Sequence, residues 1–179
     1  MLLLALLAAA AGAPAEARPA EPTVGQAVRG AALELCTGLV RGQITQATLP
    51  AERFAIRRLP EMEAELASAA KGQRPVIFGG EAAGNLLLLT WWPNARQCNV
   101  TFKGSQALKT MAEIRAALDA AGSGYGRAPN IGNPPAGFPN AFVYRSKPGA
   151  AALTVKLYLA AADDASRSHV VEVQAVNAR

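Results

Sequence analysis

Apolar residues recur at intervals of three and four along two long segments of the chain, which is the spacing of helices that bury one face. The first segment covers 23–43, where the Thr23 hydroxyl can cap the first turn. The second covers 105–121, where Ser105 can act as the cap. A shorter helix is predicted over 59–71, because a proline suits its first turn and a glycine follows its last.

Shorter segments alternate between apolar and polar residues, the period of a strand with one buried face. They are predicted as strands at 75–78, 85–92, 97–103, 141–146, 152–159 and 169–176. Residues 53–58 fit either a short extended piece or one helical turn. Because helices and strands do not alternate regularly, we predict the α+β class: a single domain over 18–179 with a mostly antiparallel sheet of about five to six strands and helices packed on one face.

The clearest strand pair is a hairpin closed by the turn Pro93–Arg96. With four residues in the loop, Trp92 opposes Gln97 and Trp91 opposes Cys98. One face of the hairpin is then wholly apolar and is predicted to face the core, with Leu87, Leu89, Trp91, Cys98, Val100 and Phe102. Trp92 is predicted on the outer face. A loop one residue longer or shorter would reverse the facing of one strand relative to the other.

The two cysteines of the chain both fall on positions predicted to face the core. Cys36 lies on the apolar stripe of the first helix, and Cys98 lies on the apolar face of the hairpin. In an oxidising compartment, an even pair of cysteines most simply forms one disulfide. We therefore predict a Cys36–Cys98 disulfide, which would close a long loop of the chain.

Two glycine-rich segments are predicted to lie outside the regular elements. A phosphate-binding loop needs a helix after its glycines, but a strand follows Gly79–Gly84, so this segment is predicted as a turn. Residues 122–140 are rich in glycine and proline and are predicted to form a flexible loop. Tyr125, Arg127 and Phe138 make it a possible binding loop, and ordinary disorder is the alternative.

The N-terminal segment predicts export. Leu2–Ala11 is a continuous run of leucine and alanine, and two A-x-A cleavage patterns follow it, ending at Ala15 and Ala17. We predict a signal peptide at 1–17 and a location in the periplasm or outside the cell. No lysine or arginine precedes the apolar run, which departs from the usual pattern. No integral membrane segment is expected in the mature chain, because no other segment is long and apolar enough.

Composition narrows the function classes that remain. The chain has 179 residues and a formal net charge of +5, but its lysines and arginines are scattered, so no nucleic-acid partner is expected. One histidine and two cysteines are too few for the common zinc sites, and we expect no metal and no cofactor. His169 lies near Ser166 and Asp163 in the sequence, which does not define a catalytic triad. We expect an edge histidine in a polar loop and assign no catalytic residue.

The outer face of the predicted sheet is the main candidate for function. It carries Trp92, Lys103, Lys156 and Tyr158, and aromatic residues beside cations are common in recognition surfaces. We therefore expect a non-catalytic binding or interaction module, whose partner is an envelope protein or a small anionic ligand. The same pattern fits a second interpretation equally well, in which another helix or a dimer partner covers this face. The alternative functions are an envelope enzyme with its site under the 122–140 loop and a structural envelope protein.

The positions of the two cysteines in the chain also resemble those in a known group of proteins. Cys36 ends the helical sequence Leu-Glu-Leu-Cys, and Cys98 lies within the strand sequence Arg-Gln-Cys-Asn-Val. In this layout, the mature chain resembles small uncharacterised exported proteins of proteobacteria, which have one cysteine in the first helix and one in a central strand. The resemblance implies no assigned activity, and no residue role follows from it.

Overall fold

The computed structural model describes residues 23–69, 73–82, 84–129, 134–147, 152–161 and 167–176 of the chain. The predicted signal peptide at 1–17 lies outside these residues, as do Ser166 and Asp163. Among the described helices, none is both long enough and apolar enough to cross a membrane.

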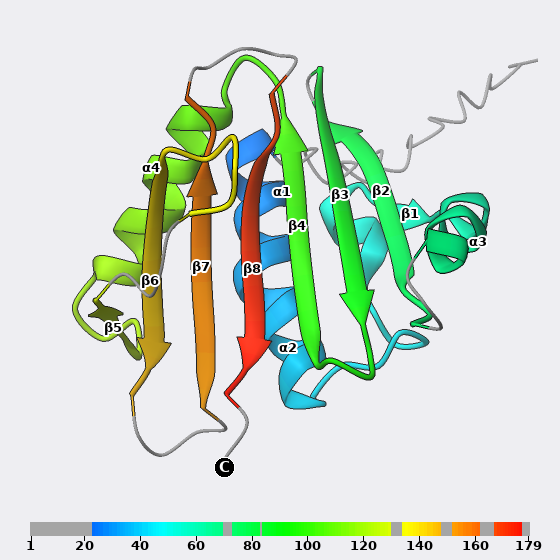
Figure 1. Ribbon diagram of the computed structural model, residues 1–179, viewed down its shortest axis with the longest axis horizontal. Helices are drawn as coiled ribbons and strands as arrows, with labels where there is room; N and C mark the ends of the chain where they lie inside the picture. Colours follow the sequence, from blue (N-terminus) through cyan, green and yellow to red (C-terminus); the bar gives the residue numbers. More distant parts are fainter. Residues whose placement is uncertain are drawn as a thin grey trace, which may run out of the picture.

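The described residues contain one antiparallel sheet of eight strands in the order β1-β2-β3-β4-β8-β7-β6-β5 (Figure 1). The strands are β1 (Arg57–Arg58), β2 (Val76–Ala82), β3 (Asn85–Trp92), β4 (Gln97–Lys103), β5 (Tyr125–Ala128), β6 (Asn140–Ser146), β7 (Leu153–Leu159) and β8 (His169–Ala175). The predicted α+β class is confirmed, but the predicted strand number was too low. The six predicted strands are the long ones, and the two short edge strands were missed because four residues or fewer give no readable alternation.

In the part of the chain that the structure describes, three helical segments accompany the sheet, and two of them cover one of its faces. The first runs through α1 (Val24–Gly30), a π-helical turn η1 (Ala31–Cys36) and α2 (Thr37–Arg41), and the second is α4 (Ala107–Asp119). Both lie behind the sheet in Figure 1. The third, α3 (Pro60–Ala69), lies beside β1 and β2 at one edge of the sheet (Figure 1). A 3-10 turn, η2 (Ala51–Phe54), precedes β1, so the ambiguous 53–58 segment contains both a helical turn and an extended piece.

The two halves of the sheet repeat one order of elements. Each half has a covering helix, then a short edge strand, then three long strands, and the last strands of the two halves, β4 and β8, pair at the centre. The segment between the edge strand and the first long strand is α3 in one half and includes 134–139 in the other. In Figure 1, α3 lies beyond the β1–β2 edge of the sheet, whereas the segment 134–139 lies in front of β7.

The core lies between the sheet and the covering helices, and the predicted disulfide crosses it. Cys36 and Cys98 are fully buried and bonded, with their Cα atoms 5.3 Å apart. The hairpin register is the predicted one, since Trp92 pairs with Gln97 and Trp91 pairs with Cys98. The disulfide thus ties the first helix to the centre of the sheet.

The two predicted helix caps had different outcomes. The Thr23 hydroxyl accepts a hydrogen bond from the Gln26 N–H, and the Gln26 side chain accepts one from the Thr23 N–H, which completes a capping box. The prediction for Ser105 was wrong, because α4 begins two residues later. There the Asn85 side chain, from a neighbouring strand, accepts from the Gln106 N–H at 3.4 Å. A tertiary contact therefore replaces the local cap.

Three predictions for loops and turns were also wrong. β2 continues to Ala82, through most of the segment predicted as a glycine-rich turn. Its Gly80 is needed for packing, since a Cβ there would lie 1.9 Å from the Ala55 carbonyl oxygen. His169 is no edge residue: it is fully buried in β8, and its Nδ1 accepts from the Ala160 N–H at 3.3 Å. The 122–140 segment contains β5, which pairs with β6.

Candidate functional site

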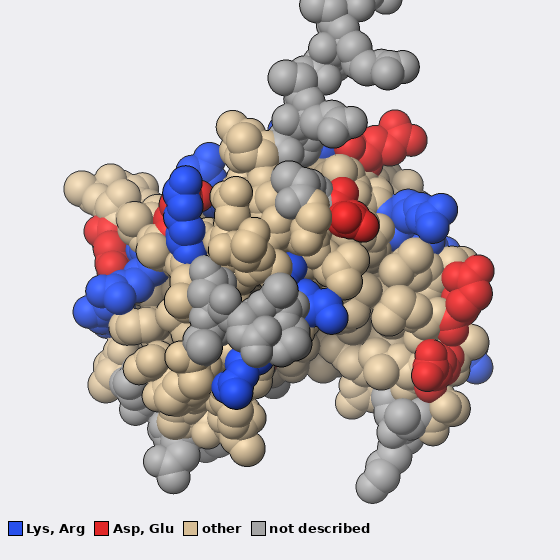
Figure 2. All heavy atoms as spheres, turned by 90° about the horizontal axis from the view of Figure 1, so that it is seen from above, with Lys and Arg blue, Asp and Glu red and all other residues tan. Residues whose placement is uncertain are grey.

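The face of the sheet opposite the covering helices, here named the open face, carries all four residues predicted for a binding surface. Trp92 and Lys103 lie on it at opposite ends of the β3–β4 hairpin, and Lys156 and Tyr158 lie on it in β7. All four side chains are half-buried. Figure 2 shows the molecule from above, where its outline is hollowed on the side of this face.

Lys156 and Tyr158 belong to a polar cluster with Glu172 of β8. The Lys156 ammonium donates to a Glu172 carboxylate oxygen at 2.6 Å. Burial raises the pKa of Tyr158, and the charge of Glu172 raises it further. Burial alone would lower the pKa of Lys156, but the hydrogen bond and charge of Glu172 raise it above its usual value. At neutral pH the tyrosine is therefore neutral and the lysine charged, so neither is activated as a nucleophile or base.

The three residues predicted for a binding loop are divided between the two faces of the sheet. Phe138 lies over the open face, with its ring centroid 5.8 Å from that of Tyr158. Tyr125 and Arg127 lie in β5, and the Arg127 guanidinium lies 5.3 Å from the centre of the Phe142 ring, on the side of the covering helices. The predicted loop residues therefore do not converge on one site.

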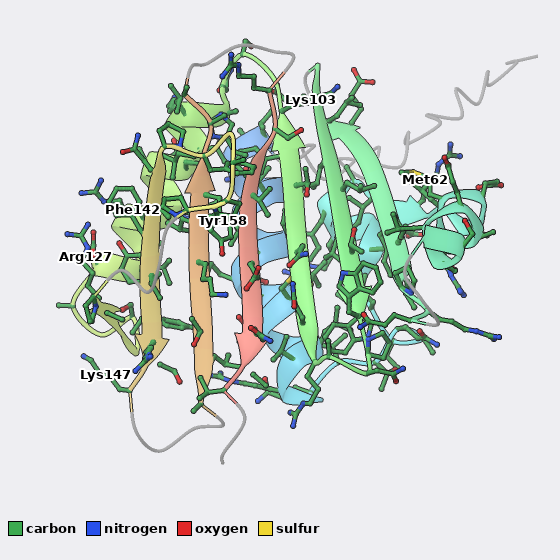
Figure 3. All side chains as sticks on the ribbon, viewed as in Figure 1. Met62, Lys103, Arg127, Phe142, Lys147 and Tyr158 are labelled. Atoms are coloured by element: carbon green, nitrogen blue, oxygen red, sulfur yellow. A yellow bond between two sulfur atoms is a disulfide. The ribbon has the colours of Figure 1, made fainter. Side chains whose placement is uncertain are left out.

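The side chains around Phe142 form a structural cluster at the β5 edge. The Arg115 guanidinium lies 4.5 Å from the centre of the same ring, and Asp119 is within ion-pair distance of both arginines. The Tyr144 hydroxyl donates to Asp119 at 3.0 Å, and burial raises the pKa of Tyr144. Arg127 is thus paired with neighbouring side chains of the chain itself, at the β5 edge of the sheet (Figure 3).

A groove on the open face, near α3, was not singled out by the sequence. It has a volume of about 590 Å³. Its lining comes from β1, α3, β2, β3, β4 and the residue just before β8, and includes Arg57, Leu59, Met62, Gly79, Glu81, Leu86, Leu88, Thr101, Lys103 and Ser168. Of the predicted binding residues, only Lys103 lines it. The run of four leucines at 86–89 is the signal in the sequence, because alternation places two of them outward.

The position of α3, which forms one wall of the groove, is fixed by Glu63. Two nitrogens of Arg58 donate to its carboxylate at 2.8 and 2.9 Å, and the backbone N–H of Ile77 donates to it at 3.0 Å. The hydrogen bond from Arg58 is the main reason why the pKa of Glu63 is lowered. Glu63 therefore joins the helix to β1 and β2 at the edge of the sheet.

The groove has an apolar part and a charged rim. Met62 is 40% exposed and Leu86 is 49% exposed, values that are high for large apolar side chains in a folded protein. Arg57, Lys103 and Glu81 are the charged lining residues, and neither cation forms an ion pair with a described residue. The site therefore presents unburied apolar surface together with available positive charge.

Comparison with protein-family models, with curated proteins and with solved structures gives no match for this chain. The interpretation of the site therefore depends on the chain's own residues.

Proposed function

We propose that this protein is a non-catalytic binding module that holds its ligand in the groove of the open face. The observation that carries this proposal is the exposure of Met62 and Leu86 inside a groove of about 590 Å³. Ligand sites are typically concave, mostly apolar, and about 300–1,000 Å³ in volume. The unactivated state of Lys156 and Tyr158 supports binding rather than catalysis on this face.

The proposal includes a location in the periplasm or outside the cell. The fully buried Cys36–Cys98 disulfide supports it, because such bonds persist mainly in oxidising compartments. The apolar Leu2–Ala11 segment followed by A-x-A patterns supports it as well.

The binding proposal is tested with anilinonaphthalene sulfonate, an aromatic anion with a large apolar surface. Backbone amide NMR spectra are recorded during titration of the full chain. Amide shifts should concentrate in α3 and in β2–β4. Leu86→Glu should abolish them, because it places a charge in the groove at a side chain already half exposed.

Val176→Glu is the matched control, because Val176 is 44% exposed and does not line the groove. It should leave the titration unchanged. Shifts concentrated in the covering helices, or equal binding by the Leu86→Glu protein, would contradict the proposal.

A further inference from the structure

The floor of the groove is formed by leucine side chains that pack over a glycine of β2. Gly79 faces the groove opposite Leu88, and a Cβ at Gly79 would lie 2.6 Å from a Leu59 methyl carbon and 3.3 Å from a Leu88 methyl carbon. The glycine therefore lets side chains of two different elements form one apolar floor. A side chain at this position would displace Leu59 or Leu88 and so disturb this floor.

The walls beside this floor are also apolar. Leu86 lies next to Leu88 on the outward side of β3 and forms one wall of the groove. Met62 projects from α3 and forms part of the wall on the α3 side. Figure 3 shows Met62 on α3, at the edge of the sheet, and Lys103 at the end of β4. Methionine adapts its shape to different apolar partners, so this wall suits a flexible chain.

Three polar lining groups lie at the β4 end of the groove, and two charged ones lie at the β1–β2 side. Lys103 pairs with Leu86 across the hairpin, and Thr101 and Ser168 lie at the same end as Lys103 in β4 and just before β8. At the β1 side, Arg57 pairs with Gly79, and Glu81 of β2 lies opposite Leu86, between the two cations. Lys103 is the cation that lies together with the hydroxyls of Thr101 and Ser168, so an anion there can receive hydrogen bonds as well as a positive charge.

A peptide is a poor fit to this groove. An extended peptide must find partners for its own N–H and C=O groups when it leaves water. The floor and walls offer methyl and methylene groups of Leu59, Leu86, Leu88 and Met62. Thr101, Lys103 and Ser168 lie together at the β4 end, where they can receive one polar head group.

We infer that the groove binds a single-chain lipid anion, with its hydrocarbon chain along Leu86, Leu88 and Met62 and its head group at Lys103. This inference rests on the proposed binding function and names its ligand class. Burial of one methylene raises the affinity by up to about fourfold. A groove that is open on one side buries each methylene only in part, so we expect about half of that free energy, which corresponds to about twofold in affinity for each methylene.

The experiment measures displacement of anilinonaphthalene sulfonate from the full chain by dodecanoate, octanoate and dodecyltrimethylammonium, each below its micelle concentration. Dodecanoate should displace the probe. Octanoate, which has four fewer methylenes, should bind about 15-fold to about 250-fold more weakly. The cationic amphiphile should also bind more weakly than dodecanoate, because its head carries the same sign of charge as Lys103.

Two pairs of variants separate the apolar and charged contributions. Lys103→Glu should weaken dodecanoate binding by about tenfold and remove the preference for an anionic head, whereas Lys109→Glu, at an exposed position of α4, should change neither. Leu86→Glu should abolish binding of both carboxylates, and Val176→Glu should not. Thermal unfolding of each variant checks that the fold is retained.

Several results would overturn the lipid assignment. These are equal affinities for dodecanoate and octanoate, equal affinities for the anionic and cationic amphiphiles, or binding to anionic phospholipid vesicles without binding to dissolved dodecanoate. If the fluorescent probe still maps to the groove while dodecanoate fails to displace it, only the ligand class is wrong. If the probe does not map to the groove either, the proposed binding function fails as well.

Discussion

Removal of the Cys36–Cys98 disulfide should cost about 4 kcal/mol of the free energy of unfolding. The two cysteines are 62 residues apart. In the chain-entropy model, the bond lowers the conformational entropy of the unfolded chain by about 2.1 cal/mol/K plus 1.5R times the natural logarithm of the number of residues in the loop. For a loop of this length the sum is roughly 14 cal/mol/K, or about 4 kcal/mol at 25 °C. Domains are usually stable by about 5–15 kcal/mol, so the loss is a large share.

The assay is urea unfolding of the oxidised protein, of the same protein with its disulfide reduced, and of the double variant Cys36→Ala, Cys98→Ala. Reduction should lower the urea midpoint. It should also raise the slope of the unfolding free energy with urea, because the unconstrained chain exposes more surface when unfolded. The double variant serves as the control for the reductant, which should change nothing in a chain without thiols. Both cysteines are fully buried, so the alanine variant should lose a further contribution from packing.

One result would refute the entropic reasoning. If thiol counting shows complete reduction while the midpoint and slope stay at their oxidised values, the bond does not restrict the unfolded chain. A midpoint that falls at unchanged slope would instead assign the stabilisation to the folded state.

Three further predictions concern the sheet and its edge. Trp91→Ala should destabilise the protein by about 3–5 kcal/mol in urea unfolding, because Trp91 is only 8% exposed, whereas Trp92→Ala should cost less than half as much. Gly80→Ala should lower the thermal midpoint by several degrees, since its methyl group would meet the Ala55 carbonyl oxygen, and an unchanged midpoint would show that the 51–58 segment moves freely. The pKa of Glu63 is lowered in the folded protein, so its ionised carboxylate stabilises the fold. This stabilisation is complete above the unfolded pKa of about 4.3 and is lost as the pH falls through the folded pKa. Glu63→Gln should therefore flatten the decline of the thermal midpoint between about pH 5 and pH 3, and parallel curves for the two proteins would contradict this.

The β3–β4 hairpin could be predicted residue by residue because local features determine it. The turn Pro93–Arg96 sets the loop length, and the alternation on both sides sets the face, so one register satisfies both. The disulfide followed from the same periodicity, since the helical stripe and the strand face each place a cysteine toward the interior. Predictions of this kind need only the period of the pattern and the geometry of one turn.

The groove could not be predicted, because its parts come from elements that are brought together only by tertiary contacts. Met62 reaches the open face through the bonds of Glu63 to Arg58 and to the Ile77 N–H. Nothing in the local sequence distinguishes Glu63 from the other acidic residues of that helix. The role of Gly79 could not be predicted for a related reason, because a glycine that makes room for neighbouring side chains and a glycine that forms a turn look alike in a sequence.

The repeated order of elements explains why the site lies in one half of the sheet. β2 and β6 hold corresponding places in the two halves, but β2 presents Gly79 to the open face whereas β6 presents Val143, which is buried. In the second half, the segment before β6 also places Phe138 against Tyr158, so apolar surface is covered from within the chain. In the first half, the corresponding segment is the helix that carries Met62, which leaves its methionine half exposed. The same strand order therefore yields a filled surface in one half and an open groove in the other, and the difference comes from side chains and from the segment that precedes the first long strand of each half.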